Sequence, residues 1–361
     1  MKCIFVIPRM GGGGAERVLA NQANTLADEK NSITIMTIVG GESFYPIDEK
    51  VNYISANVKV NRNNRVSLIW SETIGFFKSF LFFRKKIKEL KPDFVFSQQR
   101  QADIICYFVK KSGIKFKHIC YEINDPFVRS YNTKRLLKII YKNSDMLICQ
   151  SEAVKKFYIN VPNIQVIPNP INPNVIPKRV MPTKNRIVAV GRLDKQKNFS
   201  MLLSAFKEVV KAIPDCVLDI YGEGVLRHSL EEQIALLGIQ NRAFLRGSHG
   251  DVLELIKDAT VFAMSSDYEG MPNALLEAMA IGLPVVSTDF KTGVARELIE
   301  PGIGIVVPVD DERAFAKALI SIIEDKSYLK NAATISPKKM QSLHNDSIMK
   351  KWIDAFESVC D

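Results

Sequence analysis

The sequence predicts an α/β protein built from two doubly wound domains, each a parallel sheet with helices on both faces. Three observations lead to this prediction. Short apolar runs alternate with segments of helical periodicity along most of the chain, the pattern typical of β-α-β units. A proline-rich segment interrupts this alternation near the middle of the chain. The length of 361 residues also exceeds what a typical single hydrophobic core needs.

The first predicted domain covers residues 1–167. A run of glycines follows its first strand, and a helix is expected directly afterwards, at residues 15–26. The repeated β-α-β order implies parallel strands that are covered on both faces. The strands are expected at residues 4–7, 32–39, 94–97, 118–121 and 146–149.

Residues 168–182 are predicted to be an interdomain linker, because prolines stand at positions 168, 170, 173, 177 and 182. Proline can continue neither a helix nor a central strand. The alternation then starts again in a second domain, expected at 183–341, and a last helix at 342–361 contains Trp352 and Phe356. The second domain is expected to have strands at 186–190, 217–221, 243–245, 261–264, 285–287 and 305–307, with helices at 200–212 and 226–237.

The composition is that of a soluble globular protein, with 47% hydrophobic and 24% charged residues. No stretch reaches the ~18 consecutive apolar residues of a membrane-spanning helix, and the apolar run at residues 3–7 is too short for a signal peptide. The cysteines are scattered without a Cys-x-x-Cys pair, which favours reduced thiols and argues against a zinc site. We therefore expect a cytoplasmic protein.

The net charge of +10 is unevenly distributed, because basic residues outnumber acidic ones only in residues 1–180. A basic half should meet an anionic partner, and charge alone allows either nucleic acid or an anionic membrane surface. No nucleic-acid-binding motif accompanies the charge, and the phenylalanines at 76–83 are clustered rather than interleaved with basic residues. We therefore expect no nucleic-acid partner.

Residues 66–91 combine aromatic and aliphatic residues with a basic cluster at Arg84, Lys85, Lys86 and Lys88. A helix of this composition suits an anionic membrane surface. The expected location is therefore peripheral, at the inner face of the cell membrane. A core helix with a solvated basic end is an equally weighted alternative.

The segment from Glu269 to Ser287 carries the strongest signal for function. It runs Glu-Gly-Met-Pro-Asn-Ala-Leu-Leu-Glu and then Ala-Met-Ala-Ile-Gly-Leu-Pro-Val-Val-Ser. A turn that delivers backbone N–H groups at a helix N-terminus can bind an anion. Glu269 and Glu277 can each accept hydrogen bonds from hydroxyl groups, so the segment suits a nucleotide sugar. Taken alone, it is also compatible with an ordinary loop–helix–strand unit.

This segment resembles the signature of glycosyltransferase family 4, whose members are retaining enzymes of the GT-B fold. The resemblance extends over nearly the whole chain. It implies two Rossmann-like domains that face a central cleft, with the C-terminal helix packed back on the first domain. It also implies that Glu269 contacts the donor sugar and that Glu277 accepts hydrogen bonds from the ribose. The donor-binding turn between them is implied at Gly270, Met271, Pro272, Asn273 and Ala274.

A charged turn, Gly191-Arg192-Leu193 followed by Lys195 and Lys197, comes directly after the strand expected to open the second domain. Charge grows on a diphosphate leaving group as the glycosidic bond breaks, and cations placed there stabilise it. The resemblance assigns this role to Arg192 and Lys197, with Gly191 beside the donor. A solvated charged loop is the alternative interpretation.

Glycines mark further predicted ligand contacts. Four consecutive glycines, residues 11–14, allow a ligand to approach the backbone closely, although a flexible strand–helix connector is the alternative. Two other glycines stand in turns after strands of the second domain. The resemblance implies contacts with the donor at Gly13, Gly14, Gly222 and Gly247, and with the acceptor at Gly11, Gly12 and Arg17.

The chain departs from the family pattern after the strand expected at 118–121, where many members carry a His-Asp pair. Here the sequence is Asn124-Asp125-Pro126, a form that resembles members acting on bacterial polysaccharides. Asparagine cannot act as a base. The predicted route therefore lets the leaving phosphate deprotonate the acceptor hydroxyl while the protein supplies positioning and charge. His118 is expected to be a packed core residue.

The chain contains no Asp-x-Asp segment that would hold a divalent metal on the diphosphate. With Arg192 and Lys197 available, we expect metal-independent chemistry. No cofactor is expected, because the nucleotide sugar is a substrate.

The resemblance therefore predicts a retaining hexosyltransferase. It would move a hexose or N-acetylhexosamine from a nucleotide-diphosphate donor, a UDP-sugar, to a saccharide acceptor. A polyprenyl-diphosphate-linked glycan is the expected acceptor, in bacterial surface polysaccharide or glycan biosynthesis. A UDP-sugar 2-epimerase of the GT-B type is the alternative. The predicted catalytic residues are Arg192, Lys197, Glu269 and Asn124; Asp125, Arg62, Arg65 and Arg100 are expected on the acceptor side.

Overall fold

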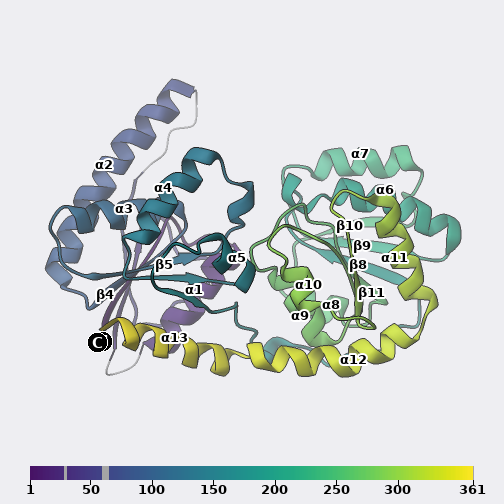
Figure 1. The fold of residues 1–361 in the computed structure, drawn as a ribbon. Helices are drawn as coiled ribbons and strands as arrows, with labels where there is room; N and C mark the ends of the chain where they lie inside the picture. The colour runs from purple at the N-terminus through teal and green to yellow at the C-terminus, as the bar shows by residue number, and fades with distance from the viewer. Residues whose placement is uncertain (28–30, 59–64, 361) are drawn as a thin grey trace. The chain divides into compact units, whose positions relative to one another are not determined.

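The structure is a computed structural model that describes the chain apart from residues 28–30, 59–64 and 361; the side chains of residues 65–73 and 360 are also outside the described part. The chain divides into two compact units: unit 1 is Met1–Asn169 with Ile348–Asp361, and unit 2 is Pro170–Ser347. Each unit contains one parallel sheet with helices packed against it (Figure 1). None of the helices in the described part combines the length and the apolar character that crossing a membrane requires.

The sheet of unit 1 has seven strands in the order β3-β2-β1-β4-β5-β6-β7. Every neighbouring pair is parallel. The strands β4 and β6 are fully buried and largely apolar, as a sheet covered on both faces requires, although β4 ends in the polar residues Ser97 and Gln98. The strands are β1 (Lys2–Ile7), β2 (Ser32–Thr37), β3 (Asn52–Ser55), β4 (Phe94–Gln98), β5 (Lys117–Glu122), β6 (Met146–Cys149) and β7 (Ile164–Val166).

Successive side chains of these strands point to opposite faces of the sheet. On one face, Ile4 of β1 belongs to a core cluster with Phe83 of α2 and Ile105 of α3. The other face carries the aromatic side chains discussed next. The helices of unit 1 are α1 (Gly14–Leu26), α2 (Arg65–Leu90), α3 (Arg100–Lys111), α4 (Tyr131–Lys142), α5 (Glu152–Phe157) and the last helix, α13 (Asn345–Cys360), with a 3-10 turn at Pro126–Val128.

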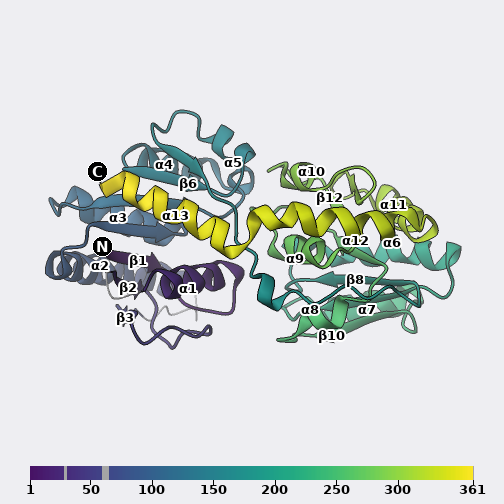
Figure 2. The same ribbon diagram turned by 90° about the horizontal axis from the view of Figure 1, so that it is seen from below.

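Helix α13 covers the aromatic face of the unit 1 sheet. The ring of Phe356 stacks on that of Phe94 with centroids 4.6 Å apart, and Trp352 meets Phe96 edge-on at 5.3 Å. Both α13 side chains are fully buried. Residues 348–361 therefore complete the core of the unit that begins at residue 1, and Figure 2 shows α13 lying along this sheet.

The sheet of unit 2 has six parallel strands in the order β10-β9-β8-β11-β12-β13. One core cluster includes Phe206 and Phe315 packed with Ile187 and Ile220 of the sheet. The strands are β8 (Arg186–Val190), β9 (Val217–Tyr221), β10 (Ala243–Gly247), β11 (Val261–Met264), β12 (Val285–Thr288) and β13 (Gly304–Val307). The helices are α6 (Phe199–Ala212), α7 (Arg227–Leu237), α8 (Val252–Ile256), α9 (Asn273–Ile281), α10 (Val294–Leu298), α11 (Glu312–Glu324) and α12 (Ser327–Met340).

Each sheet has one point where the strand order reverses, between β1 and β4 in unit 1 and between β8 and β11 in unit 2. In open parallel sheets, ligands bind outside the carboxyl ends of the strands at this switch point. The loop of residues 11–14 follows β1 and Arg100 follows β4, whereas residues 191–198 follow β8 and residues 265–269 follow β11. Both switch points therefore carry residues that the sequence singled out.

The predicted fold class is confirmed, since both sheets are parallel and helix-covered. Several strands have the predicted bounds, for example β6, β8 and β11. Strands β3 and β7 were not expected from the sequence, because they are edge strands with half-buried residues and lack a clear apolar run. The helix expected at 342–361 begins only at Asn345, because Gln341–Leu343 form a 3-10 turn.

Candidate active site at the switch point of unit 2

The turn after β8 brings the side chain of Lys197 over the backbone of Gly191. A Cβ added to Gly191 would lie 2.9 Å from Cε of Lys197, so any larger residue would require the lysine stem to move. Asp194 caps the short 3-10 helix Lys195–Lys197 by accepting from the N–H of Lys197 at 3.3 Å. Asn198 ends that turn in the left-handed conformation, with φ of 43°, and caps the next helix. The local sequence therefore fixes where Lys197 points.

The residues after β11 place Glu269 opposite this lysine. Nζ of Lys197 lies 2.6 Å from Oε1 of Glu269, and both side chains are largely buried. Ser266 also donates to Oε1 of Glu269, at 2.8 Å, and Gln196 donates to Oε2 at 3.2 Å. A charge pair taken out of water is stable only when further hydrogen bonds satisfy both groups, and Glu269 has these bonds.

Buried hydroxyl groups hold the backbone beneath this pair. Ser265 donates to the carbonyl of Lys197 at 2.7 Å, and Thr292 donates to the carbonyl of Glu269 at 3.0 Å. Thr288 of β12 donates to the carbonyl of Ser266 at 2.5 Å. Because each hydroxyl is buried and bonded, these loops are rigid supports for the two charged side chains.

Asp267 stands beside the pair and links it to the end of the preceding turn. Nδ2 of Asn198 donates to Oδ1 of Asp267 at 2.7 Å. Burial raises the pKa of Asp267, the hydrogen bond from Asn198 opposes this change, and the nearby charge of Asp310 adds to it. The two loops of the switch point are thus joined at Asn198–Asp267 as well as at Lys197–Glu269.

Helix α9 begins four residues after Glu269. Pro272 precedes its first residue, Asn273, and gives no side-chain cap to the helix start. Backbone N–H groups at such a start can bind an anion, which agrees with the predicted role of residues 270–274. Glu277 is the fifth residue of α9 and is half-buried, one turn into the helix.

Arg192 and the two further glycines flank the same region. The guanidinium of Arg192 is exposed and lies 3.2 Å from the carboxylate of Asp194. The N–H of Gly222 donates to the carbonyl of Gly247 at 2.8 Å. A Cβ on Gly222 would overlap the carbonyl oxygen of Gly191 at 1.9 Å, so the turns after β8 and β9 touch through bare backbone.

The predicted residues of unit 1 form a separate set at its own switch point. Gly13 is the N-cap of α1, and Gly14 is the first residue of that helix, which has no side-chain cap hydrogen bond. Nε2 of Gln98, at the end of β4, donates to the carbonyl of Ala15 at 3.1 Å. A Cβ on Gly13 would clash with the buried Glu16 at 2.3 Å, whereas Gly12 has only ordinary contacts, with Phe44. Gly11 stands beside Arg9, and Arg17 bonds through its N–H to the carbonyl of Gly13.

Asn124 and Asp125 lie in the loop after β5. The N–H of Asn124 donates to Oε1 of Glu122 at 3.1 Å, and Asp125 caps the 3-10 turn by accepting from Phe127 at 2.7 Å. Arg100 is the first residue of α3. Arg62 lies outside the described residues, and Arg65 is described only as the first residue of α2, without its side chain.

His118 is fully buried, as expected of a core residue, and burial lowers its pKa to about 3. Its Nε2 lies 2.9 Å from Oγ of Ser97. A neutral, buried imidazole cannot serve as a base for a substrate at the surface.

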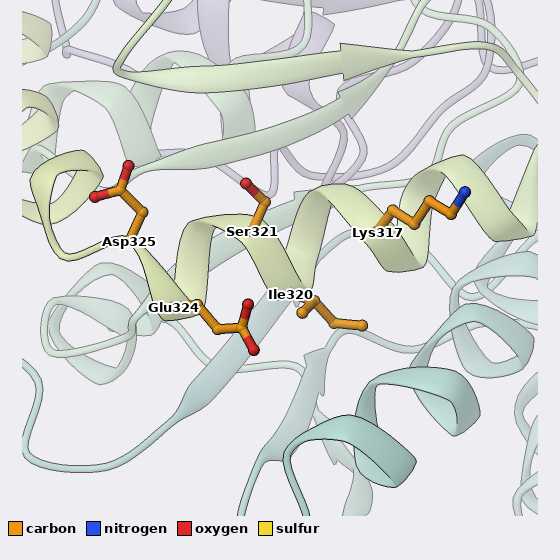
Figure 3. Close-up of a pocket in the computed structure, with 5 residues that line it drawn as sticks. All are labelled: Lys317, Ile320, Ser321, Glu324 and Asp325. Carbon is orange, nitrogen blue, oxygen red and sulfur yellow. The ribbon is translucent and has the colours of Figure 1, made fainter.

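One shallow hollow lies elsewhere in unit 2, along α11, and has a volume of about 430 Å³ (Figure 3). Its only cation among the lining residues is Lys317, while Glu324 and Asp325 are acidic, so it disfavours a diphosphate. Within the described residues, no group of three or more His, Cys, Asp or Glu side chains is placed to hold a metal ion.

The structure brings Lys197 and Glu269 into contact and places Gly191 and the start of α9 beside the loops that carry them. Sequence reasoning missed Gln196, Ser266 and Thr292 as partners of Glu269. Ser266 was signalled only weakly, as a polar residue shortly after an apolar strand, and Gln196 and Thr292 stand in loops where an amide or hydroxyl is ordinary.

Two family models match the chain. The model described as Glycosyltransferase Family 4 matches residues 12–175, and the model described as Glycosyl transferases group 1 matches residues 174–339. Together the matches include the glycine loop of unit 1 and the Lys197–Glu269 pair of unit 2. The chain therefore belongs to the family-4-like glycosyltransferases of the GT-B fold.

Curated relatives extend over nearly the whole chain. A Campylobacter jejuni protein, GalNAc-alpha-(1->4)-GalNAc-alpha-(1->3)-diNAcBac-PP-undecaprenol alpha-1,4-N-acetyl-D-galactosaminyltransferase, is 28% identical over 99% of each chain. An Escherichia coli protein, UDP-Gal:alpha-D-GlcNAc-diphosphoundecaprenol alpha-1,3-galactosyltransferase, is 26% identical over 87% of this chain and 85% of its own length. The Anabaena protein HepE, solved with UDP and glucose, shares the fold with a TM-score of 0.79 at 18% identity, over 99% of this chain and 100% of that one. These similarities favour a glycosyltransferase over a 2-epimerase.

Proposed function

We propose that the chain transfers a hexose or an N-acetylhexosamine, with retention, from a UDP-sugar to a saccharide carried on a polyprenyl diphosphate, in bacterial surface polysaccharide or glycan assembly. The observation that carries this proposal is the Lys197–Glu269 pair beside the start of α9. A cation, a helix start and a carboxylate within one switch point match the diphosphate and the hydroxyl groups of a nucleotide sugar.

In this proposal Lys197 and Arg192 contact the donor diphosphate. The bond between the anomeric carbon and the phosphate oxygen breaks while the acceptor oxygen bonds to the same face of that carbon. The acceptor proton moves to an oxygen of the departing phosphate, so no protein base is consumed. Lys197 stabilises the negative charge that grows on the diphosphate, and it does so without a metal ion. Glu269 accepts hydrogen bonds from sugar hydroxyls and orients the ring.

The similarities support the donor and acceptor classes. The C. jejuni and E. coli relatives are named for acceptors on undecaprenyl diphosphate, and the E. coli relative is named for UDP-galactose. HepE was solved with UDP. Glu277 is proposed at the ribose, with Gly222 and Gly247 near the nucleotide. Asn124, with Asp125, Arg100, Gly11 and Gly12, is proposed on the acceptor side, in unit 1, whereas Gly13 and Gly14 are proposed to contact the donor.

Transfer is tested with the full chain, a panel of UDP-sugars and a short polyprenyl-diphosphate glycan. We expect one sugar to be transferred in the presence of EDTA, and proton NMR of the product to show the anomeric configuration of the donor. An inverted product would overturn the retaining mechanism. Interconversion of UDP-sugars without an acceptor would instead support the epimerase.

Helix α2 has two faces of different character that support a membrane partner. Ser79, Phe83 and Ile87, four residues apart, are buried against unit 1. The opposite stripe exposes Ile74, Phe77 and Leu81 by 46%, 63% and 54%. Lys78, Lys85 and Lys88 are exposed on this same side.

Exposed apolar side chains rimmed by lysines match the interface of an anionic bilayer. We therefore place the enzyme peripherally at the cytoplasmic face of the membrane, where α2 would rest on anionic lipid near the acceptor. Figure 1 shows the first turns of α2 extending past α3 and α4.

Co-flotation with vesicles tests this surface. We expect binding to phosphatidylglycerol vesicles, weak binding to phosphatidylcholine, and loss of binding in Phe77→Ser/Leu81→Ser. Leu236→Ser is the control, because Leu236 is also an exposed leucine, at 87%, but lies in unit 2 and not on α2. Equal binding of both variants to anionic vesicles would overturn the assignment of α2.

A further inference from the structure

Glu122 is a buried carboxylate that neither the family signature nor the donor site uses. It is the last residue of β5 and is 1% exposed. Arg129 forms a bidentate ion pair with it, and Tyr158 donates to Oε2 at 2.8 Å. Tyr141 lies 3.2 Å from the same oxygen. A buried charge with this many donors is held in one orientation.

The position of Glu122 follows from the alternation of β5. His118, Cys120 and Glu122 share one face of the strand, whereas Tyr121 points to the other. The shared face lies against α3 and α4, where Ser97 and Tyr141 approach. A polar cluster is thus built into the side of the sheet opposite α13.

Further hydrogen bonds connect Glu122 to a second buried carboxyl group, that of Asp103. Ser97 donates to Oδ1 of Asp103 at 2.7 Å, and Tyr141 lies 3.1 Å from Oδ2 of Asp103. Burial raises the pKa of Asp103 to about 8, so its carboxyl is protonated at neutral pH. The Tyr141 hydroxyl can donate to Oδ2 of Asp103 or to Oε2 of Glu122, so it links the two buried carboxyl groups.

The same carboxylate holds both ends of the loop that follows β5. At the near end, Oε1 of Glu122 accepts from the N–H of Asn124 at 3.1 Å. At the far end it pairs with Arg129, the residue that closes the 3-10 turn Pro126–Val128. Between them, Asp125 caps that turn. Glu122 therefore fixes the loop that presents Asn124 and Asp125.

We propose that Glu122 is a positioning residue for the acceptor side of the transfer, acting through Arg129, Tyr141 and Tyr158 on the loop of Asn124 and Asp125. The inference rests on the proposed transferase function and deepens it. If the loop shifts, the acceptor hydroxyl is no longer aligned with the anomeric carbon, and water competes for the activated sugar. Donor binding in unit 2 stays unchanged.

The test compares Tyr158→Phe and Glu122→Gln with a matched control, Tyr121→Phe. Tyr121 is also a buried tyrosine of unit 1 whose hydroxyl is bonded, but to Asn169 and Gln150 rather than to Glu122. For each variant, transfer to the acceptor and hydrolysis of the donor are measured together with the Kd for UDP. Tyr158→Phe removes one hydroxyl group and keeps the folded chain available if Glu122→Gln fails to fold.

For Tyr158→Phe and Glu122→Gln we expect the ratio of transfer to hydrolysis to fall about tenfold or more, with kcat/KM for the acceptor reduced and the Kd for UDP unchanged. Tyr121→Phe should keep the wild-type ratio. A ratio in Tyr158→Phe equal to that of the control would overturn the positioning role. Wild-type protein without any transfer would instead refute the proposed function, so the two failures are distinguishable.

Discussion

The two switch points of the molecule share a topology but differ in how fully their polar groups are hydrogen-bonded. In unit 2, Glu269 is bonded to Lys197, Gln196 and Ser266, and its carbonyl accepts from Thr292. In unit 1 the corresponding loop is a run of glycines, and Oε1 of the buried Gln98 has no hydrogen-bond partner within the described residues.

This difference indicates that the two sites work differently. Groups that are pre-organised before the reaction need no rearrangement when charge develops, so a complete charged site suits the donor diphosphate. A glycine loop beside an amide oxygen that has no partner among the described residues leaves hydrogen-bonding groups available to a substrate. We therefore expect substitutions in unit 2 to act on the chemical step and substitutions in unit 1 to act on acceptor use.

Replacing Lys197 by alanine gives the largest expected effect. It removes the cation from the proposed leaving group and leaves Glu269 buried without its main partner. The kcat for transfer should fall by about a hundredfold to a thousandfold. Steady-state kinetics of Lys197→Ala and of Lys211→Ala, an exposed paired lysine of the same unit, measure this difference. Equal rates in the two variants would refute the role of Lys197.

Matched glycine substitutions sharpen the comparison of the two turns. Gly191→Ala places a methyl group 2.9 Å from Cε of Lys197, whereas the nearest atom to a Cβ at Gly12 is 3.6 Å away. We expect Gly191→Ala to lose activity about tenfold to a hundredfold by moving the lysine. Gly12→Ala should keep a wild-type Tm. A large loss of Tm in Gly12→Ala would show that the loop of unit 1 is as tightly packed as that of unit 2.

The pH dependence of unit 1 is a third test. Burial raises the pKa of Asp103 to about 8 in the folded chain from its ordinary value of 3.8, so the free energy of unfolding falls as pH rises through this range. Burial lowers the pKa of His118 from 6.5 to about 3 in the folded chain, so His118 makes the free energy of unfolding rise with pH up to pH 6.5. Between pH 6.5 and 8, of these two groups only Asp103 lowers the free energy of unfolding. At about 1.4 kcal/mol per pH unit, the loss over this range is about 2 kcal/mol.

Urea unfolding followed by tryptophan fluorescence measures this loss, because both tryptophans, residues 70 and 352, belong to unit 1. Asp103→Asn should reduce the difference in the free energy of unfolding between pH 6.5 and 8. The charged neighbours Glu122 and Arg129 remain in both proteins, so the comparison isolates Asp103. An unchanged pH profile would contradict the protonated carboxyl.

The smallest effect concerns a buried amide in α1. Gln22 is fully buried, and neither Nε2 nor Oε1 has a hydrogen-bond partner within the described residues. Gln22→Met keeps the shape of the side chain and removes the cost of burying two polar atoms without hydrogen bonds. The free energy of unfolding should therefore rise by about 1 kcal/mol. Chemical denaturation of the wild type and of Gln22→Met measures this difference. A loss of stability would mean that the amide is bonded to ordered water.

Much of the fold could be predicted from local sequence. Strands such as Met146–Cys149 are short apolar runs between polar residues, and the structure gives them the predicted bounds. The edge strand Asn52–Ser55 was missed because only pairing with β2, not its own residues, makes it a strand. Local signals are strong in the middle of a sheet and weak at its edges.

The candidate site was predictable where chemistry is carried by a contiguous motif. Residues 269–277 and 191–197 are two such motifs, and the structure joins them through Lys197 and Glu269. The Glu122–Arg129 pair was not predictable, because β5 places Glu122 toward tyrosines that lie far along the chain. Its contacts are set by tertiary packing, which a single sequence does not display.

The return of α13 to unit 1 has a consequence for how the chain is made. Unit 2 ends at Ser347, so its whole sequence has been synthesised before Trp352 and Phe356 exist. The rings of Phe94 and Phe96 therefore lack their cover until the whole of unit 2 has been translated. On the ribosome, unit 1 starts before unit 2 but is completed after it, and loss of residues 348–361 would leave an aromatic surface open to chaperones and aggregation.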